Sequence, residues 1–315
     1  MKITFSHIGL AKLCGWFGIT RQAYYNHSWK AFEVVNQHHI IADRVNEIRT
    51  NHPRLGTRKL YDMLQPFFKE HQIKMGRDSL FNVLYENHLL VRNRKRKIST
   101  TNSHHRFRKY PNLIREFIPT AINQLWVSDI TYWKIEEKHV YISFITDAYS
   151  HKIVGYYVAQ TLETFESLQA LKMALNSIKT KPVRLIHHSD RGIQYCSNSY
   201  VKLLQDYEIK ISMTENGDPL ENAIAERING IIKEEYLYNY QVNSFIEAKK
   251  LLNIVVDLYN NERPHMSINN LTPNQVHQSA EKLKLNKLWK NYYKKNSTIV
   301  KQKQDINQTV NLLQD

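Results

Sequence analysis

The sequence predicts an α/β core, a mixed five-stranded sheet with flanking helices, preceded by an all-α region. Two patterns indicate this. Residues 120–279 alternate between short runs of β-branched and aromatic residues and segments with apolar residues at helical spacing. Residues 1–90 show only short helical segments, separated by turns that contain glycine or proline. Residues 91–119 are expected to form a basic linker, and residues 280–315 a C-terminal helix and tail.

The first helical segments have the pattern of a helix-turn-helix unit. Apolar residues from Ile8 to Cys14 are spaced as in a helix, a break at 15–18 follows, and Thr20 can cap the next helix, residues 21–27. In such a unit the second helix binds DNA. Its candidate contact residues are Arg21, Gln22 and Tyr25. A plain helical hairpin has a similar pattern.

A second set of helices is expected around 40–48, from an N-cap at Thr57, and over 77–86. This set forms either a second helix-turn-helix unit or a plain helical bundle. Two basic residues of its middle helix, Arg58 and Lys59, are further candidate DNA contacts. In the linker, the candidate contacts are Arg94, Lys95, Arg96 and Lys97. Basic linkers beside DNA-binding domains often bind phosphates, and a solvated charge run is the alternative.

The charge balance favours a polyanionic partner. Lys and Arg total 44 against 29 Asp and Glu, and the resulting net charge of +15 attracts nucleic acid. No run of about 18 apolar residues is present, so no membrane span is expected, and no signal peptide is recognised. The two cysteines are too few for a disulfide framework or a Cys-rich zinc site, and they fit a reducing cytoplasm.

The core is expected to follow the order βββαβαβα. Its strands are expected at 125–135, 139–150, 152–161, 183–190 and 209–214. Its helices are expected at 164–178, 197–208, 222–238 and 245–260. The first three strands form an antiparallel meander and the later ones alternate with helices, so the sheet is mixed.

Three acidic residues fall at informative positions in these elements. Asp129 lies inside the first strand, where an unpaired buried carboxylate is costly unless a metal or an opposite charge compensates it. Asp190 ends the fourth strand before a glycine-containing loop, a common position for a site in α/β proteins. Glu226 lies on the helix 222–238, and 35 residues separate it from Asp190. Asp147, the alternative first acid, precedes a turn and is interpreted as a turn residue.

The helix that contains Glu226 has a polar stripe. Its members are Asn222, Glu226, Asn229 and Lys233. They recur at helical spacing on one face, while isoleucines mostly cover the other side and can pack on the sheet. The stripe therefore offers an amide, a carboxylate and an ammonium to a cleft, or it is a solvent-exposed face of the helix.

Several segments of the chain are distinctive in both sequence and order. They are WVSDITYW, HHSDRGIQYCS, TENGDPLENAIAERINGIIKEEY and YNNERPHMSINNLTPNQV, preceded by LAKLCGWFGITRQAYYNH and HPRLGTRKLYDML. Together they resemble the second-reading-frame (OrfB) transposases of bacterial insertion sequences, which have a retroviral-integrase-like (DDE) catalytic core. The resemblance covers nearly the whole chain up to about residue 280.

This resemblance implies a ribonuclease H-like fold and a metal-dependent enzyme. It assigns the catalytic and metal-binding roles to Asp129, Asp190 and Glu226, with two Mg²⁺ ions that Mn²⁺ can replace. Lys233 and Asn222 are expected to contact DNA. His188 and Gln194 are expected to contact the acids without binding the metal, although a surface position is the commoner fate of a histidine.

The resemblance also implies the reaction and the partners. The enzyme would cleave DNA strands at insertion-sequence ends and transfer them to a new site. Its partners would be double-stranded DNA, with terminal inverted repeats and a target, and further copies of the same chain on that DNA. The product of an upstream reading frame is another expected partner. The location would be the bacterial cytoplasm, at the nucleoid when the protein is bound to DNA.

Two other functions are compatible with parts of the sequence. A DNA-binding regulator would keep the helix-turn-helix units and have an inactive integrase-like core, but the intact acids argue against it. A ribonuclease H-type nuclease would act on RNA–DNA hybrids. It is disfavoured because the sequence has no obvious fourth acid near the site and has a DNA-binding pattern in its N-terminal region.

Overall fold

The computed structural model describes residues 6–92, 106–136, 138–178, 184–215 and 219–279. The chain divides into two compact units, one of residues 1–51 with 55–92 and one of residues 52–54 with 93–315. The predicted tail, residues 280–315, lies outside the described residues, as do the candidate contacts Arg94, Lys95, Arg96 and Lys97. Within the described part of the chain, no helix is both long and apolar enough to cross a membrane.

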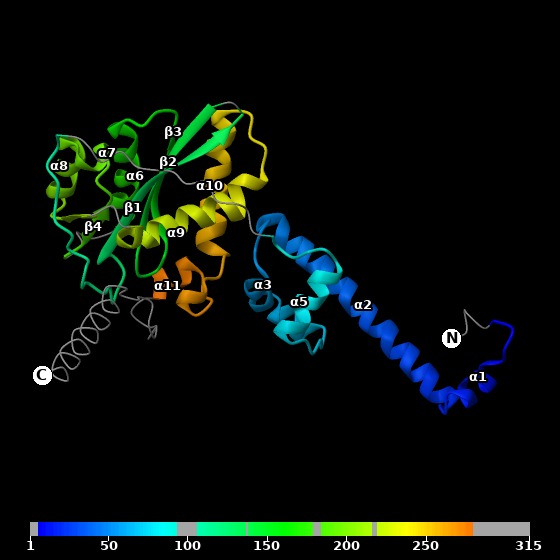
Figure 1. Cartoon of the computed structure of the whole chain (residues 1–315). Coiled ribbons are helices and arrows are strands. Elements are labelled where there is room, and N and C mark those ends of the chain that lie inside the picture. Colours follow the sequence, from blue (N-terminus) through cyan, green and yellow to red (C-terminus); the bar gives the residue numbers. More distant parts are fainter. Residues whose placement is uncertain (1–5, 93–105, 137, 179–183, 216–218, 280–315) are drawn as a thin grey trace, which may run out of the picture. The chain divides into compact units, whose positions relative to one another are not determined.

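The first unit is helical, as the sequence predicts. Its helices are α1 (Leu10–Trp16), α2 (Arg21–Asn51), α3 (Thr57–Met63), α4 (Gln65–Glu70) and α5 (Arg77–Glu86) (Figure 1). The predicted cap at Thr20 is confirmed, because its Oγ1 accepts a hydrogen bond from Ala23 N at 3.0 Å. The predicted cap at Thr57 is wrong by one residue, since Gly56 is the N-cap of α3 and Thr57 is its buried first residue.

Helix α2 is longer than predicted. The segments 21–27 and 40–48, expected as separate helices, belong to one continuous helix of 31 residues (blue in Figure 1). This stretch contains neither glycine nor proline, so no residue in it breaks the helix. The first helix-turn-helix unit would therefore have a long second helix rather than the short one expected.

The second unit contains a five-stranded mixed sheet in the order β3-β2-β1-β4-β5 (Figure 1). The strands are β1 (Leu125–Ile135), β2 (Lys138–Asp147), β3 (Ile153–Ala159), β4 (Ile186–Ser189) and β5 (Lys210–Met213). The first three form an antiparallel meander, whereas β4 pairs in parallel with both β1 and β5. This order is that of the ribonuclease H-like fold, and the predicted fold class is confirmed.

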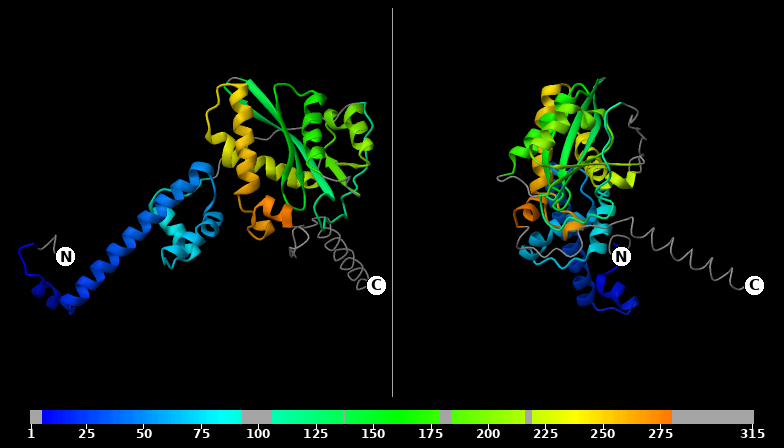
Figure 2. Two further views of the ribbon diagram at one scale, coloured as in Figure 1. Left: turned by 180° about the vertical axis from the view of Figure 1, so that it is seen from behind. Right: turned by 90° about the vertical axis from the view of Figure 1, so that its left-hand side faces the viewer.

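Helices pack on both faces of the sheet (Figures 1 and 2). On one face, Trp126 and Ile145 pack against α6 (Thr164–Asn176), α7 (Ile193–Cys196) and α8 (Asn198–Asp206). On the other face, Trp133 and Phe144 pack against α9 (Ala223–Ile231), the π-helix η2 (Ile232–Tyr236) and α10 (Phe245–Asn261). The shorter elements are η1 (Pro219–Asn222), η3 (Leu237–Asn239), η4 (Met266–Ile268) and α11 (Pro273–Ser279). The predicted helix 222–238 is thus divided among α9, η2 and η3.

Strand β3 approaches helix α6 closely at Gly155. A Cβ at this position would lie 2.2 Å from the carbonyl oxygen of Ala170 and 2.9 Å from the Cβ of Ala174. The nearest of these atoms belongs to the backbone, which cannot move away as the end of a flexible side chain can. Glycine is therefore required for this contact.

We expect Gly155→Ala to lower the free energy of unfolding by about 1–3 kcal/mol, because the added methyl group overpacks the contact between β3 and α6. Gly230→Ala is the matched control. Gly230 lies in α9, where a Cβ meets nothing within 4 Å, and alanine there should stabilise the helix by about 0.5–1 kcal/mol. Urea unfolding followed by circular dichroism measures both variants, and equal stability of the two would contradict the close approach.

Candidate active site

The candidate site lies where β1 extends beyond β4. Strand β4 pairs with β1 only along Leu125–Val127, so the rest of β1 has no β4 neighbour on that edge. Asp129 is the second residue past this ladder and is half-buried. The register pairs Val127 with His188, and Asp190 follows β4 directly. Because β1 and β4 are parallel, Asp190 comes level with Asp129 at the same end of the sheet.

The polar stripe predicted on the helix lies along this part of β1. Three hydrogen bonds join the two elements: Asn222 Nδ2 to Ser128 O (3.0 Å), Asn229 Nδ2 to Asp129 Oδ2 (2.7 Å) and Lys233 Nζ to Thr131 Oγ1 (2.9 Å). The fourth member of the stripe, Glu226, has an exposed side chain. The stripe is therefore mainly a docking face rather than a solvent-exposed face, which was the alternative interpretation.

Two of the predicted acids, Asp190 and Glu226, lie within electrostatic range of the third, Asp129. Burial, together with the negative charges of Asp190 and Glu226, raises the pKa of Asp129 to about 8. Hydrogen bonds from Ile130 N and from Asn229 oppose this shift. Like charges shift each other's pKa in this way only when they are near neighbours. The structure thus brings together three acids that are far apart in the sequence.

The donor set suits a hard divalent cation. Mg²⁺ prefers oxygen ligands, and it binds one or two carboxylates while it keeps several waters. Among the described residues, no three His, Cys, Asp or Glu side chains are arranged to enclose one ion. An open, water-rich magnesium site needs no such cage. A cation beside these carboxylates would also relieve the repulsion that raises the pKa of Asp129.

A tight loop fixes the carboxylate of Asp190. Gly192 N donates to Asp190 Oδ1 at 3.0 Å. A Cβ on Gly192 would lie 3.0 Å from the same oxygen and 3.2 Å from Gln194 Oε1, so a larger residue would press on this carboxylate. The amide nitrogen of Gln194, a residue predicted near the acids, donates to Leu162 O at 2.8 Å.

Two buried histidines lie next to each other on β4. His188 Nδ1 is 2.8 Å from Ser212 Oγ, and burial lowers the pKa of His188 to about 4, so its ring is neutral at pH 7. Its predicted contact with the acids stays a prediction. His187 Nε2 is 2.8 Å from Ser128 Oγ and 3.0 Å from Tyr200 Oη. No role was predicted for His187 from the sequence, although a pair of histidines inside an apolar strand indicates buried polar contacts.

Asn229 is the site residue that the sequence analysis placed on the stripe but left without a role. It is 6% exposed, and its amide holds the carboxylate of Asp129. Its position three residues after Glu226 places it on the same face of the helix as that acid, and this spacing could have indicated a role at the site. Asn222 is also buried, and within the described structure its Oδ1 has no hydrogen-bond partner. The DNA contact predicted for Asn222 stays a prediction.

Asp147, the alternative first acid, stabilises a turn. Its Oδ1 accepts hydrogen bonds from Ser150 N at 2.8 Å and from Ser150 Oγ at 2.7 Å. Its Oδ2 accepts one from Asn123 N at 2.7 Å. Both carboxylate oxygens are thus used within the fold, and the interpretation of Asp147 as a turn residue is confirmed.

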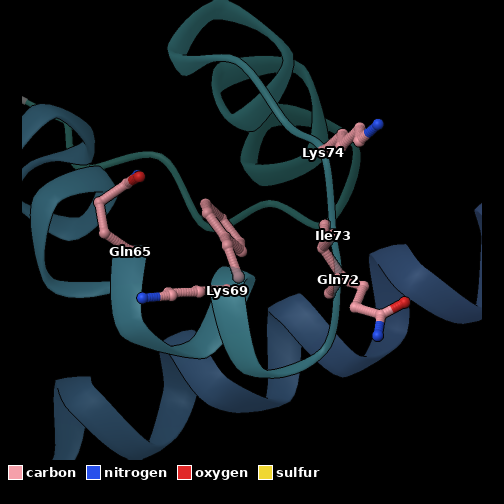
Figure 3. Close-up of a pocket in the computed structure, with 6 residues that line it drawn as sticks. Gln65, Lys69, Gln72, Ile73 and Lys74 are labelled. Carbon is pink, nitrogen blue, oxygen red and sulfur yellow. The ribbon is translucent and has the colours of Figure 1, made fainter.

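The first unit contains the remaining predicted contacts. Arg21, Gln22 and Tyr25 are exposed at the start of α2, and on α3 Arg58 is exposed while Lys59 is half-buried. A hollow beside α4 is lined by Gln65, Phe68, Lys69, Gln72, Ile73 and Lys74 (Figure 3). No acid lines it, and the ends of its two lysines point to different sides (Figure 3). This hollow therefore lacks the converging polar groups of a catalytic site.

Known proteins similar to this chain were found in three comparisons. Two family models, each described as an integrase core domain, match residues 119–219 and 207–273. The chain is 35% identical over 265 residues to the insertion element IS600 uncharacterized 31 kDa protein of Shigella sonnei. The matched region covers 83% of this chain and 96% of that protein. It is 32% identical to the transposase for insertion sequence element IS629 of Shigella sonnei, over 68% of this chain and 70% of that protein. A solved structure of the HTLV-2 integrase catalytic core domain in complex with magnesium is similar over 50% of this chain and 97% of that chain, with 21% identity and a TM-score of 0.40.

We expect Asp129→Asn to raise the free energy of unfolding by about 1–2 kcal/mol in a buffer that contains EDTA, because it removes the cost of burying a titratable carboxyl group next to two other carboxylates. The hydrogen bonds from Ile130 N and Asn229 go to different oxygens of Asp129, so the amide oxygen can keep only one of them, and this loss limits the gain. Differential scanning calorimetry measures the change. Asp206→Asn, at an exposed position of α8, is the control and should change little. A destabilised Asp129→Asn variant would argue against the mutual repulsion.

Proposed function

The chain belongs to the insertion-sequence transposases that have an integrase core, and from this premise we propose that it catalyses metal-dependent DNA strand cleavage and strand transfer at insertion-sequence ends. The observation that supports this most directly is that Asp190 and Glu226 both lie within electrostatic range of Asp129 at the open edge of β1. Phosphodiester chemistry needs such a cluster of acids, because the phosphate charge must be neutralised and an oxygen nucleophile activated.

Asp129, Asp190 and Glu226 would hold Mg²⁺, two ions in all, with Mn²⁺ able to replace it. The bound ions would supply activation of the attacking oxygen and stabilisation of the leaving oxygen. The residues around the acids prepare them for this role. Asn229 fixes the orientation of the Asp129 carboxylate, and Gly192 N does the same for Asp190.

Two reactions of the same kind would follow each other at this site. In strand cleavage, water attacks the phosphorus at the end of the element, the bond from phosphorus to the 3′ oxygen breaks, and a free 3′-OH forms. In strand transfer, this 3′ oxygen loses its proton and attacks a phosphorus of the target strand, from which another 3′ oxygen leaves. Each step exchanges one P–O bond for another, and no covalent link to the protein forms.

Other residues would bind the DNA substrate. The ammonium of Lys233 donates to Thr131, two residues along β1 from Asp129, and there it would bind a backbone phosphate of the DNA end. The exposed residues Arg21, Gln22, Tyr25 and Arg58, with Lys59, would contact the terminal repeats. The net charge of +15 supports this, because phosphate neutralisation dominates affinity for DNA. Joining two element ends to one target would require further copies of the chain, and the product of an upstream reading frame would be another partner.

We expect Asp190→Asn and Glu226→Gln each to reduce cleavage and joining on the order of a thousandfold or more, because each removes a charged ligand without changing the side-chain shape. A labelled duplex with the terminal repeat, incubated with Mg²⁺ and separated on a denaturing gel, measures both reactions. Binding of the same duplex should be retained. Asp206→Asn serves as the control with normal activity, and joining by either acid variant at the rate of the parent protein would refute the assignment.

Mg²⁺ should stabilise the protein in the absence of DNA. At a concentration a hundredfold above its Kd, Mg²⁺ is expected to raise the free energy of unfolding by about 2.7 kcal/mol, because it binds the folded acids and not the unfolded chain. Thermal unfolding with Mg²⁺, with Mn²⁺ and with EDTA measures the effect. The shift should disappear in Asp129→Asn and persist in Asp206→Asn. An equal shift in both variants would place the metal elsewhere.

A further inference from the structure

Lys233 lies in an unusual helical segment. Helix α9 continues into the π-helix η2, which is followed by the 3₁₀ turn η3. π-helical segments are rare and often occur at functional sites, because the wider turn redirects the side chains. The side chain of Lys233 is half-buried, and its Nζ donates to Thr131 Oγ1 at 2.9 Å.

Two aromatic rings flank the ammonium of Lys233. Its Nζ lies 4.6 Å from the centroid of the Tyr132 ring on β1 and 5.9 Å from the centroid of the Tyr238 ring on η3. Both distances are within the range of cation–π attraction, about 6 Å. The Tyr132 ring is in turn held edge-on by the ring of His139 on β2, at 5.7 Å between centroids. Tyr238 is 43% exposed. The rings of Tyr132 and Tyr238 together form a seat for the ammonium of Lys233, with Tyr238 on its outer side.

This arrangement keeps the positive charge of Lys233 beside the acids without pairing it to one of them. Burial lowers the pKa of Lys233, and the negative charges of Asp129 and Glu234 raise it, so these charges act on the ammonium. Its hydrogen bond nevertheless goes to Thr131, about 7 Å along the strand from Asp129 at 3.3 Å per residue. An ammonium has three donors, and aromatic faces are weak acceptors, so the cation can still bind an oxyanion.

We infer that Tyr132 and Tyr238 are positioning residues that hold the ammonium of Lys233 over β1, ready to bind a backbone phosphate of the DNA end. A free lysine has several rotatable bonds, and it loses that freedom when it binds a phosphate. The seat removes much of this cost in advance and prevents the ammonium from collapsing onto Asp129. The inference rests on the proposed role of Lys233 in DNA binding.

A double-mutant cycle on the full chain tests the seat separately from the role of Lys233. The probe is a fluorescein-labelled duplex with the DNA sequence of one end of the element, and its binding is measured by anisotropy in EDTA at several salt concentrations. Lys233→Gln should weaken binding about five- to tenfold and reduce the salt slope by about one phosphate contact. Tyr132→Leu should lose about three- to fivefold in the parent background and nothing further in the Lys233→Gln background, whereas Tyr132→Phe should bind normally.

Tyr238→Leu should show the same dependence on Lys233 with a smaller loss, since its ring is farther from the ammonium. Tyr141→Leu is the matched control, because Tyr141 is the cross-strand partner of Tyr132 in the same hairpin. Any decrease in DNA binding that it causes should be the same in the parent and in the Lys233→Gln background. Equal losses for Tyr132→Leu in both backgrounds, or no loss, would overturn the seat and leave the proposed function standing. Unchanged binding in Lys233→Gln would overturn the phosphate role of Lys233 and the seat with it.

Discussion

The rest of the candidate site depends on the way α9 lies along the open edge of β1. A strand that extends past its neighbour leaves backbone groups without ladder partners, and Asn222 satisfies one of them by donating to Ser128 O. Asn229 and Lys233 then bond to side chains farther along the same strand. Because α9 and its flanking segments η1 and η2 are tied to β1 at these points, Glu226 comes within electrostatic range of Asp129 although it lies on a helix far along the chain.

The strands could be predicted, and the three acids could be selected as candidates, because their signals are local. A carboxylate inside an apolar strand is costly, which made Asp129 stand out, and β1 has the bounds that its composition predicts. The partners of the acids depend instead on the register of β1 with β4 and on the position of α9, which no local pattern specifies. For this reason Asn229 could be placed on the polar stripe, but its bond to Asp129 could not be predicted.

Adjacent residues of β1 connect the site to both helical layers. Successive side chains of a strand point to opposite faces. Ser128 bonds to His187, whose Nε2 also lies 3.0 Å from Tyr200 Oη on α8, while Asp129 bonds to Asn229 on α9. The strand is therefore held from both sides at the position of the first acid. Such support reduces the freedom of a carboxylate that like charges would otherwise push away.

The segment 259–276, part of the resemblance to the transposases, has a structural explanation of its own. Arg263 is 1% exposed, and its Nε and Nη2 donate to the two carboxylate oxygens of Glu235 at 2.8 and 2.7 Å. A buried pair of this kind fixes orientation more than it adds net stability, because desolvation offsets the attraction. Glu235 belongs to η2, two residues after Lys233. The pair therefore anchors the π-helical segment from which Lys233 donates to Thr131, and through this segment residues 259–276 support the fold around the candidate site.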